Sequence, residues 1–299
     1  MTFKLGVDGG GTKTECILVD ADGAIVAQHL APGCNPNVVG AVQARLIVTD
    51  ALNALSTRHP QLSTPDITAV LLCMSGSRSY WQEFATGLAG FGTVTAVDDS
   101  LPVLELATHG APGLVLHAGT GSFVAARAPD GSIHYAGGLG WRFNDPGSSY
   151  DIGRRAMGRA LLELQGWLPA SRLGPTVRDH AKLGDAADVN AITRYFYQHP
   201  DPNRIIAALA PAILRLASEG DPKAHEIVVE SAGELLALAT RVATKLFPGV
   251  ALDTLPAGLS GPILTHAVVR QALLARSPLS LTPVEGTPIE GVRRLLARM

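Results

Sequence analysis

The sequence contains few cysteines, little charge and no long hydrophobic run. Its three cysteines, Cys16, Cys34 and Cys73, form no CxxC or Cys/His cluster, so neither a disulfide framework nor a zinc or iron–sulfur site is expected. Charged residues make up 17% of the chain, and 24 Lys+Arg against 26 Asp+Glu leave no basic stripe, so no nucleic-acid partner is expected. No apolar run reaches the roughly 18 residues of a membrane span, and no signal peptide is recognisable. We therefore expect a cytoplasmic protein without a membrane partner.

What the chain does contain is apolar material for two domains. Hydrophobic residues make up 46% of its 299 residues, and a prior of roughly 150 residues per domain suggests two domains. Strands are expected at residues 3–8, 14–20, 25–29, 114–118 and 123–127. Apolar residues at helical spacing predict helices at 38–55, 101–109, 150–168, 205–217, 221–247, 262–275 and 288–297. Strands that alternate with helices indicate an α/β fold, and the polar segment 172–202 is interpreted as a variable lobe or a dimer surface.

One structural unit occurs twice in the sequence. It consists of a strand, a Gly-Thr turn, a second strand, an Asp-Gly turn and a third strand. The first copy has its turns at Gly11-Thr12 and Asp22-Gly23, and the second, which starts near residue 113, has them at Gly119-Thr120 and Asp130-Gly131. The spacing between the turns is the same in both copies. The repeat predicts two similar halves with a boundary near residue 110, although unrelated hairpins that match by chance are the alternative.

The glycine turns have the composition of phosphate-binding loops. Consecutive glycines let the backbone approach a ligand and free N–H groups for anionic oxygens, although a tight hairpin without a ligand is the alternative. Asp8, at the end of the preceding strand, suits a Mg²⁺ ion held through water. Lys13 faces either the phosphates or the solvent. The predicted phosphate-binding residues are Gly10, Gly11, Thr12, Lys13 and Thr14 in the first turn, and Gly119, Thr120, Gly121 and Ser122 in the second.

Two other phosphate-binding motifs do not fit the first turn. A Walker A loop fails because Thr12 stands between Gly11 and Lys13. A dinucleotide fingerprint would open a helix, whereas residues 15–19 are strand-like. The phosphate is therefore expected on a hairpin rather than on a helix N-terminus.

Adjacent carboxylates at Asp98 and Asp99 end a strand pattern and precede the helix expected at 101–109. Ligands gather at the carboxyl ends of strands, where a carboxylate can accept the proton of an attacking hydroxyl. Adjacent side chains point to different faces, so one of the two is expected at the ligand while the other caps the helix. The alternative is that both are capping or turn residues.

Two glycine-containing loops follow. In the loop 137–149, Trp141 and Asp145 are suited to facing and binding a sugar ring, although Gly147-Ser148 alone would serve as the turn and cap of the next helix. The glycine turn at 256–262, between a strand and a helix, is suited to lying against an adenine.

Taken together, these motifs resemble the BadF/BadG/BcrA/BcrD ATPase family, in particular its N-acetylglucosamine kinase and glucosamine kinase members. The resemblance runs through GVDGGGTKT, GCNPN, VDD, AGTGS, GGLGWRFNDPGSSYDIG and GLSGP, and covers nearly the whole chain. It implies a duplicated ribonuclease-H-like fold of the actin/hexokinase type, with two lobes and an interlobe cleft. The lobes would be residues 1–112 and 113–285, with 286–299 packing back on the first.

The resemblance also implies roles for individual residues. Asp99 matches the catalytic carboxylate, and Asn35 in GCNPN matches the asparagine that contacts the sugar. Further residues implied to bind the sugar are Gly76, Gly138, Leu139, Gly140 and Asp145, and those implied to flank the nucleoside are Gly258, Ser260 and Gly261. Pro146 replaces a glutamate of the family motif, which leaves the sugar open.

Three functions are compatible with these observations. We favour phosphoryl transfer from MgATP to O6 of glucosamine or N-acetylglucosamine, with Asp99 as the base and with both turns and Mg²⁺ offsetting charge on the phosphoryl group. An ATPase that drives a partner protein would be expected to carry cluster-binding cysteines. A sugar or nucleotide sensor would bind without turnover. The resemblance further implies a homodimer.

Overall fold

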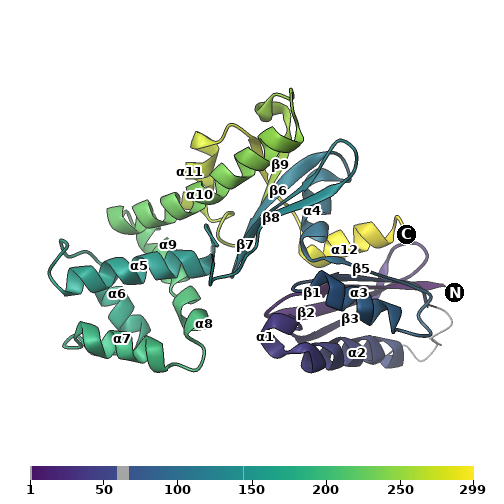
Figure 1. Cartoon of the computed structure of the whole chain (residues 1–299), viewed down its shortest axis with the longest axis horizontal. Helices are drawn as coiled ribbons and strands as arrows, with labels where there is room; N and C mark the ends of the chain where they lie inside the picture. The colour runs from purple at the N-terminus through teal and green to yellow at the C-terminus, as the bar shows by residue number, and fades with distance from the viewer. Residues whose placement is uncertain (1, 59–66, 144) are drawn as a thin grey trace. The chain divides into compact units, whose positions relative to one another are not determined.

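A computed structural model describes residues 2–58, 67–143 and 145–299 (Figure 1). The chain forms two compact units. The first unit comprises Met1–Gly110 together with Glu285–Met299, and the second comprises Ala111–Val284. Each unit contains one five-stranded mixed sheet.

The sheet of the first unit has the order β3-β2-β1-β4-β5. Its strands are β1 (Phe3–Gly9), β2 (Lys13–Val19), β3 (Ile25–Pro32), β4 (Ile67–Met74) and β5 (Thr93–Asp98). The first three strands are antiparallel, whereas β4 and β5 run parallel to β1. The helices of this unit are α1 (Pro36–Val39), α2 (Ala41–Arg58), α3 (Arg78–Thr86), α4 (Ser100–Thr108) and α12 (Pro288–Leu296).

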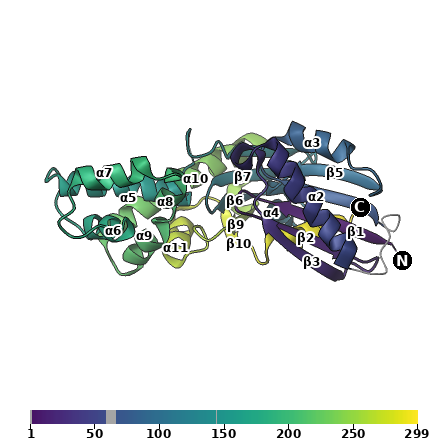
Figure 2. The ribbon, with the colours of Figure 1, turned by 90° about the horizontal axis from the view of Figure 1, so that it is seen from below.

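Helices cover both faces of this sheet, with α2 on one side and α4 and α12 on the other (Figure 1); Figure 2 views the sheet from the side of α2. Side chains of α2 and α3 share one apolar core with alternate residues of β1 and β4, and α12 packs on the opposite face with Ile17 and Leu71. The contact of α12 is close, because a Cβ on Gly6 of β1 would lie 2.5 Å from Cγ1 of Val292. A Cβ on Gly291 would overlap the backbone of Pro102 in α4. The last helix is therefore part of the core of the first unit.

The sheet of the second unit has the order β10-β9-β6-β7-β8. Its strands are β6 (Gly113–Ala118), β7 (Ser122–Arg127), β8 (Ile133–Gly137), β9 (Pro256–Ser260) and β10 (Ser280–Pro283). Its helices are α5 (Ser149–Leu164), α6 (Leu173–His180), α7 (Val189–Gln198), α8 (Pro202–Ala207), α9 (Ala210–Ser218), α10 (Pro222–Leu246), the 3₁₀ helix η2 (Leu252–Thr254) and α11 (Ala267–Arg276). One apolar core joins this sheet to its helices.

The two sheets confirm the internal repeat. Strands β1, β2 and β3 correspond to β6, β7 and β8, while β4 and β5 correspond to β9 and β10, so the strand orders match. The Gly-Thr turn joins the first two strands of each sheet: Gly9 pairs with Thr14 across four residues, and Ala118 pairs with Ser122 across three. Similar local signals have thus produced two hairpins of the same topology.

Some helix predictions are corrected by the structure. The helix expected at 38–55 is divided at Gly40, whose φ of 84° is favourable only for glycine. The helix expected at 205–217 is divided between α8 and α9, and the one expected at 262–275 begins only at Ala267. The long helix α10 begins where its signals indicate, since Asp221 accepts hydrogen bonds from the first-turn amides of Lys223 and Ala224.

The polar segment 172–202, in which no helix was predicted, contains two helices. They are α6 and α7, which have eight and ten residues. Each helix buries residues at i, i+4 spacing, namely Leu173 with Val177 and Ile192 with Phe196. None of the helices in residues 2–58, 67–143 and 145–299 combines the length and the hydrophobicity of a membrane span.

Candidate active site

The first glycine turn presents unpaired backbone amides. Gly10 closes the turn by donating from its N–H to the carbonyl of Lys13 at 2.9 Å, and Cys34 N–H donates to the carbonyl of Gly10 at 3.0 Å. In the described part of the chain, the amides of Gly11 and Thr12 have no hydrogen-bond partner, and both residues are exposed. A Cβ on Gly33 would overlap the carbonyl of Gly11, so the loop after β3 packs directly against the turn. The turn has the donors that an anion requires.

Two neighbouring residues of this turn point elsewhere. The ammonium of Lys13 lies 2.9 Å from a carboxylate oxygen of Glu15, and its side chain is 56% exposed. The side chain of Thr14 is fully buried, and its hydroxyl donates to the carbonyl of Pro32 at 2.8 Å. The prediction that the Thr14 hydroxyl binds phosphate is therefore corrected: it ties β2 to the end of β3.

Three parallel strands of the first unit end together beside this turn. In their register Gly9 aligns with Met74, and Met74 aligns with Asp98. The carboxyl ends of parallel strands are where α/β sheets bind ligands. Asp8 lies one residue before the end of β1, and Asp99 follows β5 directly. The candidate acidic residues therefore lie at one edge of one sheet.

The carboxylates of Asp8 and Asp99 are electrostatically coupled. Burial, together with the negative charge of Asp99, raises the pKa of Asp8 to about 7, while Lys13 opposes the shift. Burial also raises the pKa of Asp99 to about 6, with a contribution from Asp98. Among the described residues, no side chain or amide donates a hydrogen bond to the Asp8 carboxylate. Such uncompensated carboxylates favour a cation or a proton as the missing partner.

Helix capping does not account for the two adjacent acids. Asp99 occupies the N-cap position of α4, but its backbone is helical and its side chain makes no capping hydrogen bond. Asp98 instead lies 3.8 Å from a guanidinium nitrogen of Arg78. The prediction that one of the pair caps the helix is wrong, and the carboxylate of Asp99 is left available to a ligand.

Asn35 and Gly76 lie side by side. A Cβ on Gly76 would be 2.7 Å from Oδ1 of Asn35, and Gly76 has a φ of 94°. Oδ1 of Asn35 accepts a hydrogen bond from the amide of Asn37 at 2.9 Å as the N-cap of α1. This bond fixes the side-chain amide and leaves its nitrogen as a donor.

Sequence reasoning missed Ser75 at this place. Its amide donates to the carbonyl of Gly9 at 2.8 Å, and its carbonyl accepts from the indole of Trp81 at 2.8 Å. Its hydroxyl is buried and has no partner within the described ranges. A serine between a buried strand and a glycine was the only available signal.

The second turn is built like the first but uses its side chains differently. Gly119 N–H donates to the carbonyl of Gly121 at 2.9 Å, and Thr120 is exposed. The amide and the hydroxyl of Ser149 each donate to the carbonyl of Gly119 at 2.8 Å. The hydroxyl of Ser122 is buried and donates to the carbonyl of Pro146 at 2.7 Å. Ser122 was predicted to bind phosphate, but its hydroxyl, like that of Thr14, is buried and donates to a backbone carbonyl.

Asp145 lies directly against this second turn. Its Oδ1 accepts a hydrogen bond from the amide of Ser122 at 3.3 Å, and a Cβ on Gly121 would lie 3.1 Å from its Oδ2. Burial raises the pKa of Asp145 to about 6, although the bonds from Ser122 lower it. Gly138 joins the same place, because its amide donates to the carbonyl of Ser122 at 3.0 Å. Asp145 and Gly138, which are predicted to bind the sugar, are thus in contact with the turn that is predicted to bind phosphate.

The segment 138–140, which is predicted to bind the sugar, contains two glycines with positive φ and an exposed leucine. Gly138 and Gly140 have φ of 62° and 82°, values that favour glycine. Leu139 between them is 62% exposed.

The turn predicted to flank the nucleoside packs on the end of β6. Gly258 lies inside β9 and is buried, so its prediction as a turn residue is wrong. Gly261 has a φ of 87°, and a Cβ there would overlap the carbonyl of Ala118. His117, which lies two residues before the second turn, pairs its Nδ1 with the hydroxyl of Ser260 at 3.1 Å. Burial lowers the pKa of His117 to about 4, so its ring is neutral at physiological pH.

The sequence comparisons assign the chain to a family. The model of the BadF/BadG/BcrA/BcrD ATPase family matches residues 5–255, and the chain belongs to this family. The N-acetyl-D-glucosamine kinase of Dictyostelium discoideum is 26% identical over 255 residues, which cover 81% of this chain and 79% of that protein. The N-acetylmuramic acid/N-acetylglucosamine kinase of Clostridium acetobutylicum is 24% identical over 240 residues, which cover 79% and 77%.

A solved structure supports the same assignment. A Chromobacterium violaceum protein assigned as an N-acetylglucosamine kinase matches with a TM-score of 0.80 at 27% identity, and 99% of each chain is covered. With the two matching sheets, this confirms the predicted α/β, duplicated ribonuclease-H-like fold of the actin/hexokinase type.

Proposed function

We propose that this protein is an ATP-dependent kinase that phosphorylates an amino sugar, glucosamine or N-acetylglucosamine, at O6. The observation that carries the proposal is the carboxylate of Asp99. It stands at the carboxyl end of β5, has no capping partner and has a raised pKa of about 6. A base with these properties is ionised at neutral pH and still basic enough to accept a hydroxyl proton. Family membership and the kinases among its relatives support the same activity.

The proposed roles follow the corrected geometry. The amides of Gly11 and Thr12 bind phosphate oxygens of ATP, and so does the second turn at Gly119-Thr120, where Thr120 is exposed. Asn35 beside Gly76 binds the sugar, as does Asp145 together with the backbone of 138–140. Ser260 and Gly261 flank the nucleoside. Asp99 accepts the proton of the attacking hydroxyl.

Mg²⁺ fits the residues around Asp8. Within the described ranges, no group of three or more His, Cys, Asp or Glu side chains is arranged to hold a metal ion. Mg²⁺ does not require one, because it usually keeps several waters and binds through one or two carboxylates plus substrate phosphates. The carboxylate of Asp8, which lacks a hydrogen-bond donor in the described part of the chain, is suited to holding such a hydrated ion. When bound, the ion would offset negative charge on the phosphates.

Three broader expectations stay predictions. They are the cytoplasmic location, the homodimer, and the division into functional lobes at 1–112 with 286–299 and at 113–285. The family resemblance supports them.

Sugar-dependent release of ADP tests the proposed function. We expect ADP release with glucosamine or N-acetylglucosamine and little with glucose or without sugar. Asp99→Asn should keep ATP binding and lower turnover by about 10²–10⁴-fold, because general-base catalysis is lost. Asp98→Asn is the matched control, since Asp98 is the adjacent acid but is ion-paired to Arg78. Normal turnover in Asp99→Asn, with loss in Asp98→Asn, would show that the base is misassigned.

A further inference from the structure

The loop that carries Asp145 has a polar link to the long helix α10. Gly147 is buried, and its N–H donates to the hydroxyl of Ser231 at 2.9 Å. In the described part of the second unit, this is the only hydrogen bond between residues 145–149 and α10. The side chain of Ser231 is fully buried, so water does not compete for this bond. The packing is also close, because a Cβ on Gly147 would lie 3.2 Å from Cδ2 of Leu235.

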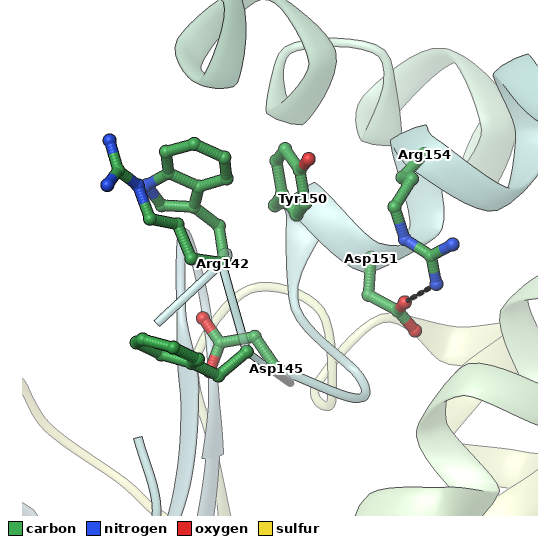
Figure 3. Close-up of a pocket in the computed structure, with 7 residues that line it drawn as sticks. Arg142, Asp145, Tyr150, Asp151 and Arg154 are labelled. Carbon is green, nitrogen blue, oxygen red and sulfur yellow. Dashed lines mark hydrogen bonds and ion pairs between the residues drawn. The ribbon is translucent and has the colours of Figure 1, made fainter. Parts of the chain in front are cut away.

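Asp151, on the first turn of α5, is the acidic centre of the contact between α5 and α10. It is buried, and its two oxygens accept hydrogen bonds from the guanidinium groups of Arg154 at 2.8 Å and Arg155 at 2.7 Å. Figure 3 shows the carboxylate of Asp151 turned to Arg154. Arg155 also binds Glu234 of α10 at 2.8 Å. Charged groups on both helices therefore hold Asp151 in place.

The hydroxyl of Ser231 consequently has one orientation. It donates to Oδ2 of Asp151 at 2.7 Å. A carboxylate paired with two guanidinium groups only accepts hydrogen bonds, and the backbone N–H of Gly147 only donates. The hydroxyl proton therefore points to Asp151, and a lone pair points to Gly147. Alanine at this position would remove both bonds and would leave the buried N–H of Gly147 without an acceptor.

The backbone of the loop determines where the carboxylate of Asp145 lies. Oδ1 of Asp145 accepts from the amide of Ser122 at 3.3 Å, which is long for a hydrogen bond. The backbone is held by shorter bonds: the amide of Ser148 donates to the carbonyl of Asp145 at 3.1 Å, and the hydroxyl of Ser122 donates to that of Pro146 at 2.7 Å. Gly147 lies between these anchored residues. A shift of Gly147 would therefore move Asp145 in the pocket of about 750 Å³ that it lines (Figure 3).

We propose that Ser231 is a positioning residue for the sugar: its hydroxyl holds Gly147 in place and thereby sets the position of the Asp145 carboxylate. The inference rests on the proposed function, because it assumes that a sugar binds at Asp145. Ser231 is fully buried and does not line the pocket, so it acts through the loop rather than by touching the sugar. Helix α10 is a suitable support, because its apolar face belongs to the core of the second unit.

Sugar affinity and turnover of Ser231→Ala test this role. We would measure the Kd of N-acetylglucosamine and of glucosamine by calorimetry, with a non-hydrolysable ATP analogue present, and kcat and KM by ADP release. Ser231→Ala should raise the Kd and the KM of the sugar about tenfold and change kcat less than about threefold, because a binding group is displaced while Asp99 is untouched. Ser231→Cys should give a smaller rise, since a thiol is a weaker donor and acceptor. An unchanged sugar Kd in both variants would overturn the inference.

Asp221→Ala is the control for a general loss of stability. Asp221 caps the same helix ten residues before Ser231, where it accepts hydrogen bonds from the amides of Lys223 and Ala224 at 2.9 Å. Loss of this cap should lower the Tm, as loss of the Ser231 hydroxyl should, but it leaves the contact with Gly147 intact. The sugar Kd of Asp221→Ala should therefore match that of the wild-type protein. An equal rise in both alanine variants would show an effect of stability rather than of position, and would contradict the proposal.

A double-mutant cycle shows whether Ser231 acts through Asp145. Asp145→Asn keeps the shape of the side chain but removes its charge, and should by itself weaken sugar binding. Ser231→Ala should then raise the sugar Kd by a smaller factor in the Asp145→Asn protein than in the wild-type protein, because the two changes affect the same contact. Additive effects, or an Asp145→Asn protein with unchanged sugar affinity, would overturn the inference.

The outcomes separate this inference from the kinase function. Turnover of either sugar by the wild-type protein, with an unchanged sugar Kd in Ser231→Ala, would overturn the inference and leave the kinase function intact. Weaker sugar binding by Ser231→Ala, without turnover by the wild-type protein, would support the positioning role and contradict the kinase function. Absence of sugar binding by the wild-type protein would contradict both.

Discussion

Replacing Asp8 by asparagine should stabilise the first unit. In the folded protein, burial and the nearby charge of Asp99 raise the pKa of Asp8 from 3.8 to about 7. One pKa unit corresponds to roughly 1.4 kcal/mol, so a shift of this size sets an upper limit of about 4 kcal/mol on the cost of the ionised form. Asp8 is partly exposed, and solvent screening reduces that cost. We expect Asp8→Asn to raise the free energy of unfolding by about 1–2 kcal/mol at pH 8.

The sign of this effect depends on pH. Below pH 3.8 the carboxyl is protonated in both states, and its ionisation costs nothing. As the pH rises towards 7, the unfolded chain releases the proton while the folded chain retains it, so wild-type stability falls over this window. Asparagine does not titrate. The advantage of Asp8→Asn should therefore be largest above pH 7 and disappear near pH 4.

Thermal unfolding without nucleotide or Mg²⁺ measures the difference in stability between Asp8→Asn and the wild-type protein. Trp81 is buried in the first unit, whereas Trp141 and Trp167 are exposed, so loss of the blue-shifted emission of Trp81 reports on the unit that contains Asp8. A gain of 1–2 kcal/mol should raise the Tm by about 2–8 °C. Asp98→Asn is the control and should change stability by less than about 1 kcal/mol, because its partner Arg78 is exposed. A destabilised Asp8→Asn variant, or a gain that does not vary with pH, would refute the reasoning.

Two further predictions concern activity. Because the pKa of Asp99 is about 6 and the base must be ionised, kcat/KM should fall about tenfold per pH unit below pH 6, and a profile that stays flat to pH 5 would contradict Asp99 as the base. Gly76→Ala should raise the KM for the sugar about tenfold or more, since its Cβ would lie 2.7 Å from Oδ1 of Asn35. Gly90→Ala has a similar backbone cost at φ 87° with nothing within 4 Å, so equal KM values for the two variants would argue against a role of Asn35.

Local signals made the repeated hairpins predictable from the sequence. Each glycine turn and each Asp-Gly turn specifies its own backbone conformation, so Gly11-Thr12 and Gly119-Thr120 were placed correctly. The helices α6 and α7 were missed because they lie in a predominantly polar segment, although each buries a pair of apolar residues at i, i+4 spacing. The start of α10 was predictable because Asp221 and Pro222 supply a capping signal in addition to the apolar pattern.

Distant partners made the side-chain roles harder to predict. Thr14 and Ser122 were predicted to bind phosphate, but their hydroxyls donate to the carbonyls of Pro32 and Pro146. Those acceptors lie 18 and 24 residues away along the chain, so no local sequence pattern predicts them. The pairing of His117 with Ser260 spans 143 residues and was invisible for the same reason.

The position of α12 has a consequence for synthesis on the ribosome. Val292 and Leu296 complete one face of the first sheet by packing on Gly6, yet they are made long after β1. Until they emerge, that face of the nascent sheet stays open to water. The second unit has all of its residues once Val284 is made, so it can fold first. The first unit, although it begins with the earliest residues of the chain, completes its core only when α12 is added.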